Sequence, residues 1–150
     1  PADGGGIAAA AGHGGRQALA PAAASAQKKS SRQSHWPKGR PTDGKKPLYS
    51  PVVTCNGFAF VSGTGKIDGG SIEEQTKYCL DSLEESLKAV GSSMAKAVKC
   101  NVFLSDINLY GPMNEVFRGR FGDNPPARTT LAVAAIPFNC MVEIEVMAEV

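Results

Sequence analysis

Two charged residues near the end of the chain, Arg128 and Glu143, carry the clearest chemical signal in the sequence. Arg128 lies in the run Pro-Pro-Ala-Arg-Thr-Thr at 125–130, and Glu143 lies in the run Val-Glu-Ile-Glu-Val at 142–146. A guanidinium group stays charged at any workable pH, and its planar fork matches a carboxylate or phosphate. A glutamate on a neighbouring strand could accept a proton or orient a water molecule. Together the two residues could hold an acidic small molecule and act on it.

Both residues lie in segments that have the pattern of β-strands. Successive side chains of a strand point to opposite faces, so Arg128 and Thr130 share one face of segment 127–135. In segment 141–150 the glutamates share one face, while the valines and Ile144 share the other. Charged residues on a strand usually face water. Spacing alone therefore favours the simpler interpretation of a half-buried sheet, with an arginine paired to its wet, acidic face.

Length and composition limit the possible classes of protein. A chain of 150 residues with 42% hydrophobic residues suits one domain with an ordinary core. A net charge of +2 does not indicate a partner such as nucleic acid or a membrane, and no apolar run is long enough to span a bilayer. The cysteines form no Cys-x-x-Cys pair and have no histidine near them, so neither a metal site nor a disulfide framework is predicted. They are Cys55, Cys79, Cys100 and Cys140.

The segment 1–46 differs from the rest of the chain. It is rich first in Ala and Gly, then in Ser, Gln, Lys and Arg, and no helical or strand period persists in it. This composition predicts a flexible or signal-like low-complexity segment. Ala24-Ser25-Ala26 before Gln27 has the small-residue spacing of a signal peptidase site, so export is one alternative and a low-complexity tail is the other. The domain itself is expected to span 47–150.

Local signals in 47–150 predict an alternation of strands and helices. Asn56-Gly57 between two apolar runs indicates a two-residue hairpin. Ser71 with Glu74 three residues later forms a capping box, and Gly91 is a suitable helix terminator. A strand is expected at 98–104, a second helix from Asn108 to about Phe121, and two strands close the chain. The apolar face expected for the first helix consists of Ile72, Thr76, Cys79, Leu80, Leu83, Leu87 and Val90.

The expected order is strand, strand, helix, strand, helix, strand, strand. An α+β arrangement with both helices on a single face of one sheet is the simplest packing. The other face carries small and mixed residues such as Thr130, Ala132 and Ala134. A lone domain would expose that face, so the pattern predicts an oligomer.

These segments together resemble the reactive intermediate deaminase family, the Rid or YjgF type, once labelled translation-inhibitor endoribonucleases. The resemblance runs from about Pro47 to Val150 in the right order and spacing. It implies a chorismate mutase-like fold, a homotrimer with three ligand sites in clefts between subunits, no cofactor, and a cytoplasmic location, with an exported or organellar one as the alternative. The matching segments are 48–52, 57–63, 71–76, 98–106, 113–117, 126–137 and 142–145.

The resemblance also implies roles for individual residues. Arg128 would bind a substrate carboxylate, and Glu143 would position the attacking water or shuttle a proton. The Gly63 backbone could approach a ligand closely. The residues expected to line the substrate site are Tyr49, Ser62, Gly63, Asn114 and Thr130.

Some of these residues also have ordinary structural explanations. Taken singly, Tyr49 could be a boundary aromatic residue, Ser62 a turn residue and Asn114 a solvated helix residue. Thr130 departs from the family pattern, because many members have a cysteine two residues after the arginine. A hydroxyl still forms hydrogen bonds but cannot become a thiolate, so thiol chemistry is removed at this position while imine hydrolysis is not.

The expected function is hydrolysis of reactive enamine and imine intermediates of the 2-aminoacrylate type to 2-keto acids and ammonia. One alternative is a non-catalytic trimer that binds small acids or has a regulatory role, and another is a structural subunit of a larger assembly. RNA cleavage has less support, because the basic residues gather in segment 28–46 without a stacking aromatic cluster. Neither a nucleic acid nor a membrane partner is expected.

Overall fold

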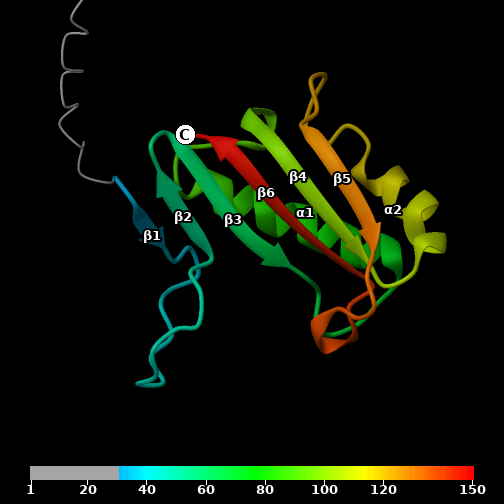
Figure 1. Ribbon diagram of the computed structural model, residues 1–150, viewed down its shortest axis with the longest axis horizontal. Coiled ribbons are helices and arrows are strands. Elements are labelled where there is room, and N and C mark those ends of the chain that lie inside the picture. The colour runs from blue at the N-terminus through cyan, green and yellow to red at the C-terminus, as the bar shows by residue number, and fades with distance from the viewer. Residues whose placement is uncertain (1–30) are drawn as a thin grey trace, which may run out of the picture.

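Two α-helices lie against one face of a six-stranded sheet in residues 31–150, which are the residues that the computed structural model describes (Figure 1). The strands are ordered β1-β2-β3-β6-β4-β5 across the sheet. The predicted α+β class, with one sheet and both helices on one face, is confirmed. The strands are β1 Gln33–His35, β2 Val52–Cys55, β3 Phe58–Thr64, β4 Ala97–Leu104, β5 Ala127–Ala132 and β6 Val142–Glu149. The helices are α1 Ile72–Lys88 and α2 Tyr110–Phe117, with 3-10 turns η1 Met94–Lys96, η2 Ile107–Leu109 and η3 Pro137–Asn139.

The two strongest local signals of the sequence form the structures that they predict. Asn56 and Gly57 both have positive φ, at 50° and 83°, as a tight hairpin turn between β2 and β3 requires. At the start of α1 the hydroxyl of Ser71 accepts a hydrogen bond from the Glu74 amide at 3.3 Å. The Glu74 carboxylate accepts one in return from the Ser71 amide at 2.9 Å.

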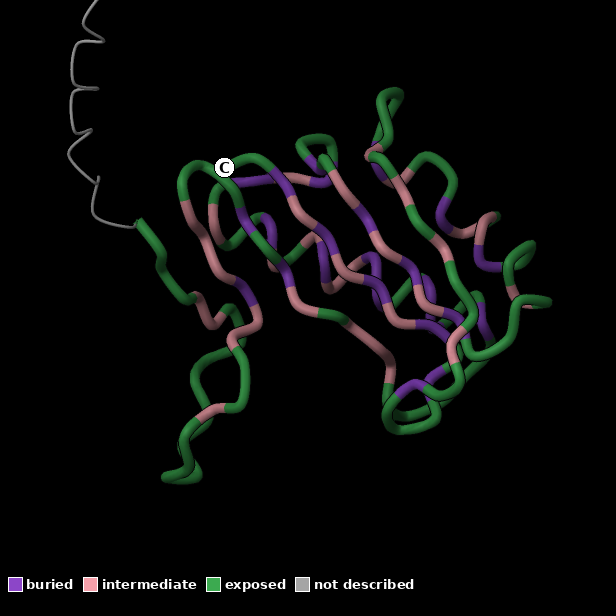
Figure 2. The backbone as a smooth tube through the Cα atoms, viewed as in Figure 1, coloured by how far each residue is buried: buried purple, intermediate pink, exposed green. Residues whose placement is uncertain are grey.

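The core lies between α1 and the sheet. Leu80, Leu83 and Leu87 of α1 are fully buried, and they face a strand β6 on which burial alternates with every residue. Figure 2 shows this alternation of buried and partly exposed positions along β6. The two faces expected for segment 141–150 are confirmed. In the described residues, neither helix combines the length and apolar character needed to cross a membrane.

Three expectations differ from the structure. The segment expected to be flexible contains β1, which pairs with β2 and places His35 Nε2 2.8 Å from Thr54 Oγ1. The second α-helix covers only Tyr110–Phe117 after a 3-10 turn, and positive φ at Gly119 and Gly122 prevents its continuation. The strands carrying Arg128 and Glu143 are not neighbours, since β4 lies between β5 and β6. The signal-like spacing at Ala24–Ala26 lies outside the described residues.

A buried glutamine holds together the two loops at one end of the sheet. Gln75 of α1 donates a hydrogen bond from Nε2 to the Gly70 carbonyl at 3.1 Å and accepts one at Oε1 from the Met141 amide at 2.8 Å. The same loops meet again where Cys140 Sγ contacts the Lys66 carbonyl at 3.4 Å. Gln75 is 1% exposed and both bonds are partly buried, so they are costly to leave unmade.

Gln75→Ala should lower the free energy of unfolding by about 2 kcal/mol, because the partly buried Met141 amide and Gly70 carbonyl lose their partners. Urea unfolding followed by circular dichroism measures the change. Lys77→Ala, two residues along the helix, removes only an exposed i,i+4 ion pair with Asp81 and should cost about 0.5 kcal/mol or less. Equal effects of the two substitutions would contradict this role for Gln75.

Candidate functional site

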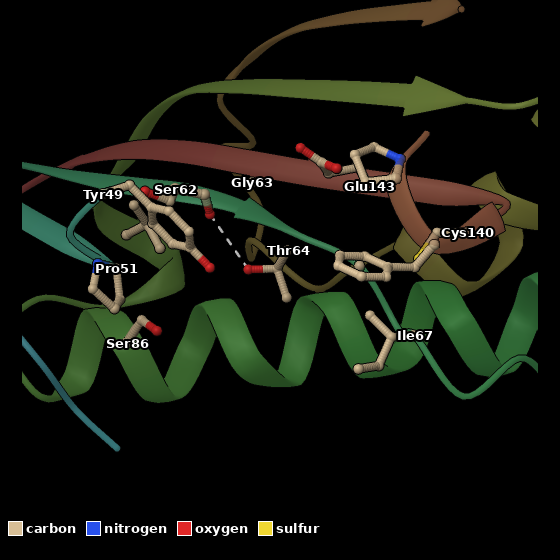
Figure 3. Close-up of a pocket in the computed structure, with 13 residues that line it drawn as sticks. Tyr49, Pro51, Ser62, Gly63, Thr64, Ile67, Ser86, Cys140 and Glu143 are labelled. Carbon is tan, nitrogen blue, oxygen red and sulfur yellow. Dashed lines mark hydrogen bonds between the residues drawn. The ribbon is translucent and has the colours of Figure 1, made fainter. Parts of the chain in front are cut away.

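A pocket of about 500 Å³ opens where β3 runs beyond the end of β2 (Figure 3). Four of the residues expected at the site line it together. They are Tyr49, Ser62, Gly63 and Glu143. They come from the segment before β2, from the end of β3 and from the start of β6, so the fold brings together residues that lie far apart in the sequence.

A β-bulge in β3 brings Gly63 against Glu143. Val61 pairs with Val146 and Thr64 with Ile144, so β3 has one residue more than β6 over this stretch. A β-carbon built on Gly63 would overlap the Glu143 carboxylate. Glycine at this position therefore leaves the space that the carboxylate occupies.

Ser62 fixes the segment that carries Tyr49. Its hydroxyl donates a hydrogen bond to the Ser50 carbonyl at 2.8 Å, and its amide donates one to the Pro51 carbonyl at 2.9 Å. Tyr49 itself is 69% exposed, and its ring lies beside Pro51 at one end of the pocket in Figure 3. Ser62 therefore positions the segment before β2, and the exposed ring of Tyr49 lines the pocket.

Arg128 lies on the face of the sheet opposite to Glu143. In the parallel pair of β4 and β5 it is the partner of Cys100, which is fully buried under the helices. Its guanidinium carbon lies 4.7 Å from the centre of the Phe117 ring and 5.7 Å from that of Tyr110, both in α2. One guanidinium nitrogen is 3.2 Å from the Tyr110 hydroxyl. These contacts hold the cation over two aromatic faces.

Glu143 lies on the face that no helix covers. Its partner in β4 is Phe103, and the next residue on that face of β6, Glu145, accepts a hydrogen bond from Asn101 at 2.8 Å. The expectation that Arg128 and Glu143 lie together on adjacent strands is therefore wrong within one chain. The strand β4 separates them (Figure 1), and the alternation of side chains places them on opposite faces.

The remaining two candidates lie with Arg128. Thr130 pairs with the fully buried Val102, which puts it on the helix-covered face. Its hydroxyl oxygen is buried and has no hydrogen-bond partner within the described part of the chain. Asn114 lies four residues after Tyr110 and three before Phe117, and so shares with them one stripe of α2. A buried hydroxyl without a partner is uncommon in folded proteins and marks a place where a ligand or water can bind.

The thiols around the pocket stay protonated at neutral pH. Burial first, and then the nearby Cys140 and Glu143, raise the pKa of Cys79 to about 12. Cys140 lines the pocket, and burial followed by the charge of Glu143 raises its pKa as well. Neither sulfur is therefore a nucleophile under ordinary conditions. Residues 31–150 contain no group of three His, Cys, Asp or Glu side chains arranged to hold a metal ion.

The lining residues that the sequence did not lead us to expect include Ile67, Phe138 and Cys140. They lie in the two loops that Gln75 joins, which local strand and helix patterns do not describe. A large aromatic residue between proline and asparagine, in a segment with turn composition, was the available signal for Phe138.

Comparison with known proteins shows the family to which this chain belongs. Residues 44–150 match the family described as endoribonuclease L-PSP. The chain is 41% identical over 108 residues to the mitochondrial protein mmf2 of Schizosaccharomyces pombe, a match that covers 67% of this chain and 86% of mmf2. It is 37% identical over 107 residues to the 2-iminobutanoate/2-iminopropanoate deaminase of Rattus norvegicus, with 67% of this chain and 78% of the rat protein covered.

Solved structures agree with the sequence comparisons. The crystal structure of a putative endoribonuclease L-PSP from Entamoeba histolytica superposes with a TM-score of 0.66 at 35% identity. The match covers 71% of this chain and 90% of that one. The chorismate mutase-like fold expected from the sequence is confirmed by this similarity.

Proposed function

This chain belongs to the reactive intermediate deaminase family, matched under the description endoribonuclease L-PSP, and on that premise we propose that it hydrolyses 2-imino acids and their enamine tautomers, including the 2-aminoacrylate type. The products are 2-keto acids and ammonia. The observation that carries the proposal is the Glu143 carboxylate, which lies in an open pocket with the Gly63 backbone against it.

Glu143 has the chemistry that this hydrolysis needs. It accepts a proton from a water molecule as the water oxygen forms a bond to the imine carbon, which gives a carbinolamine. For an imine that is protonated on nitrogen, return of that proton to the carbinolamine nitrogen makes an ammonium leaving group. The carbon–nitrogen bond then breaks as the hydroxyl proton passes to Glu143, which releases ammonia and leaves the keto group. Water is the only co-reactant, and no electrons are exchanged with an outside partner. The buried, protonated thiols nearby do not compete for the imine carbon.

The substrate carboxylate needs a cation that the pocket of one chain does not provide. Glu143 is the charged residue among those that line the pocket, and Arg128 lies on the other face of the sheet. We propose that a homotrimer completes the site, with Arg128 of one subunit presented to the Glu143 pocket of the next. Exposed apolar residues on the face without helices support association. Phe58, Phe60 and Leu131 are 40%, 43% and 53% exposed there.

Thr130 and Asn114 would accompany Arg128 into the shared site. The buried Thr130 hydroxyl has no partner within residues 31–150, so it is available to a ligand oxygen or to a bound water. The Tyr110 and Phe117 rings restrict the motion of the Arg128 guanidinium. Less conformational entropy is therefore lost when the guanidinium binds a carboxylate. The change from the common cysteine to Thr130 is compatible with this role.

The names of the relatives give partial information on the cellular compartment. They include proteins named as mitochondrial, such as mmf2 of Schizosaccharomyces pombe, and as chloroplastic, namely Reactive Intermediate Deaminase A of Arabidopsis thaliana. These names support the organellar alternative for this chain. The cytoplasmic location stays a prediction.

Arg128→Ala and Glu143→Gln should each lower kcat/KM for imine hydrolysis. The first should cost at least tenfold, because it removes charge-assisted hydrogen bonds to the substrate carboxylate. The second should cost about a hundredfold or more, because it removes the proton acceptor. The assay generates an imine in situ by oxidation of an amino acid and follows its disappearance above the spontaneous rate.

Arg118→Ala is the matched control for these variants, since Arg118 is an exposed arginine that pairs with Glu115 beside α2 and should leave the rate unchanged. Full activity of Arg128→Ala would refute the proposed role of the arginine. Tight binding of 2-keto acids by a wild-type protein without turnover would favour the non-catalytic alternative.

Gly63→Ala should lower kcat at least tenfold while leaving the melting temperature within a few degrees of the wild type. The φ of Gly63 is not in the positive range that favours glycine, so the backbone accepts alanine, but its methyl group would displace the Glu143 carboxylate. Gly111→Ala is the matched control, because no atom lies within 4 Å of a β-carbon there. An unchanged kcat in Gly63→Ala would show that the position of the carboxylate does not limit the reaction.

A further inference from the structure

Two large apolar side chains stand exposed in the same pocket as Glu143. Ile67 is 67% exposed and Phe138 is 76% exposed, and both line the pocket. In Figure 3, Ile67 and Cys140 lie at the end of the pocket away from Tyr49 and Pro51. Neither Ile67 nor Phe138 belongs to the core, so packing of the fold does not account for them.

The backbone at Phe138 is one that large residues rarely adopt. Phe138 has φ 60° and ψ 22°, and Asn139 follows with φ 56°. Asparagine tolerates this region, but phenylalanine has no local hydrogen bond with which to stabilise it. Unfavourable backbone conformations of this kind persist where the surrounding structure holds them, and they gather at binding sites.

The two loops that carry these residues are held in place by polar contacts. Lys66 donates to the Asp68 carboxylate at 2.7 Å and to the Gly69 carbonyl at 2.8 Å, which fixes the turn that contains Ile67. Gln75 joins the following stretch of this loop to the Met141 amide, three residues after Phe138. Ile67 and Phe138 are therefore exposed on ordered loops and are preorganised for an apolar ligand.

We propose that Ile67 and Phe138 form an apolar rim that binds the side chain of the substrate. The preferred substrates are then 2-imino acids with apolar side chains larger than a methyl group, such as those formed from leucine, methionine or phenylalanine. This inference rests on the proposed function and names the substrate class of the same site. The carboxylate end of the ligand contacts the polar residues of the site, and its side chain contacts the apolar rim. A larger side chain buries more apolar area against the rim and therefore binds more tightly.

The test compares binding with turnover. Isothermal titration calorimetry measures the Kd of two product acids, 4-methyl-2-oxopentanoate and pyruvate, and the in situ assay measures kcat/KM for the imines of leucine and alanine. The variants are Ile67→Ala, Phe138→Asn and the double variant, because asparagine accepts positive φ without the ring. Ile107→Ala is the control, since Ile107 is equally apolar and 56% exposed but does not line the pocket.

Wild type should bind the larger acid roughly tenfold more tightly and prefer the leucine-derived imine to a similar degree. The double variant should lose most of this preference, because its kcat/KM for the leucine-derived imine falls more than that for the alanine-derived imine, and Ile107→Ala should keep the preference. Equal affinity of wild type for the two acids, or an unchanged preference in the double variant, would overturn the inference. A preference in binding without turnover of either imine would support the apolar rim and would count against the deaminase reaction.

Discussion

The alternation of side chains along β4 is the constraint on which the arrangement of the site depends. Arg128 pairs across one edge of this strand with Cys100, and Glu143 pairs across the other edge with Phe103. Cys100 and Phe103 are three positions apart in the strand, an odd number, so they point to opposite faces. A shift of either register by one residue would exchange the buried and exposed faces of a whole strand. The hydrophobic core therefore fixes the separation of the two charges.

Under the proposed function, this separation gives each chain two half-sites. One contains Glu143, Gly63 and Tyr49 on an open pocket, and the other places Arg128 against the aromatic rings of α2. Each half-site is shaped locally, the first by a bulge in β3 and the second by cation–π contacts with α2. Because neither half can both hold a carboxylate and activate water, assembly of subunits becomes a requirement of the proposed reaction.

Much of the fold could be predicted from the sequence because its signals are local. The Asn56-Gly57 turn, the Ser71 capping box and the alternation along β6 each depend on neighbouring residues, and each is confirmed. The strand β1 has no such signal, since it is short and polar and depends on the free edge of β2. The burial of Gln75 on an apolar helix face also follows from two distant loops rather than from helical periodicity.

Only part of the candidate site could be predicted from the sequence, because four of the seven expected residues line the pocket and the other three, Arg128, Asn114 and Thr130, do not. Tyr49, Ser62, Gly63 and Glu143 do meet in one pocket, as the family resemblance implied. The insertion of β4 between β5 and β6 could not be predicted from local patterns, because strand order is decided by the packing of the whole sheet. Ile67 and Phe138 were missed for a related reason, since loops carry no periodic signal.

Subunit complementation tests the central claim most directly. Arg128→Ala keeps the Glu143 half-site and Glu143→Gln keeps the Arg128 half-site, so each variant alone should be nearly inactive. Mixed subunits, refolded together in equal amounts, should recover about a quarter of the wild-type rate, because that share of interfaces joins the two intact halves. A mixture no more active than its separate components would show that Arg128 and Glu143 do not act together across a subunit interface.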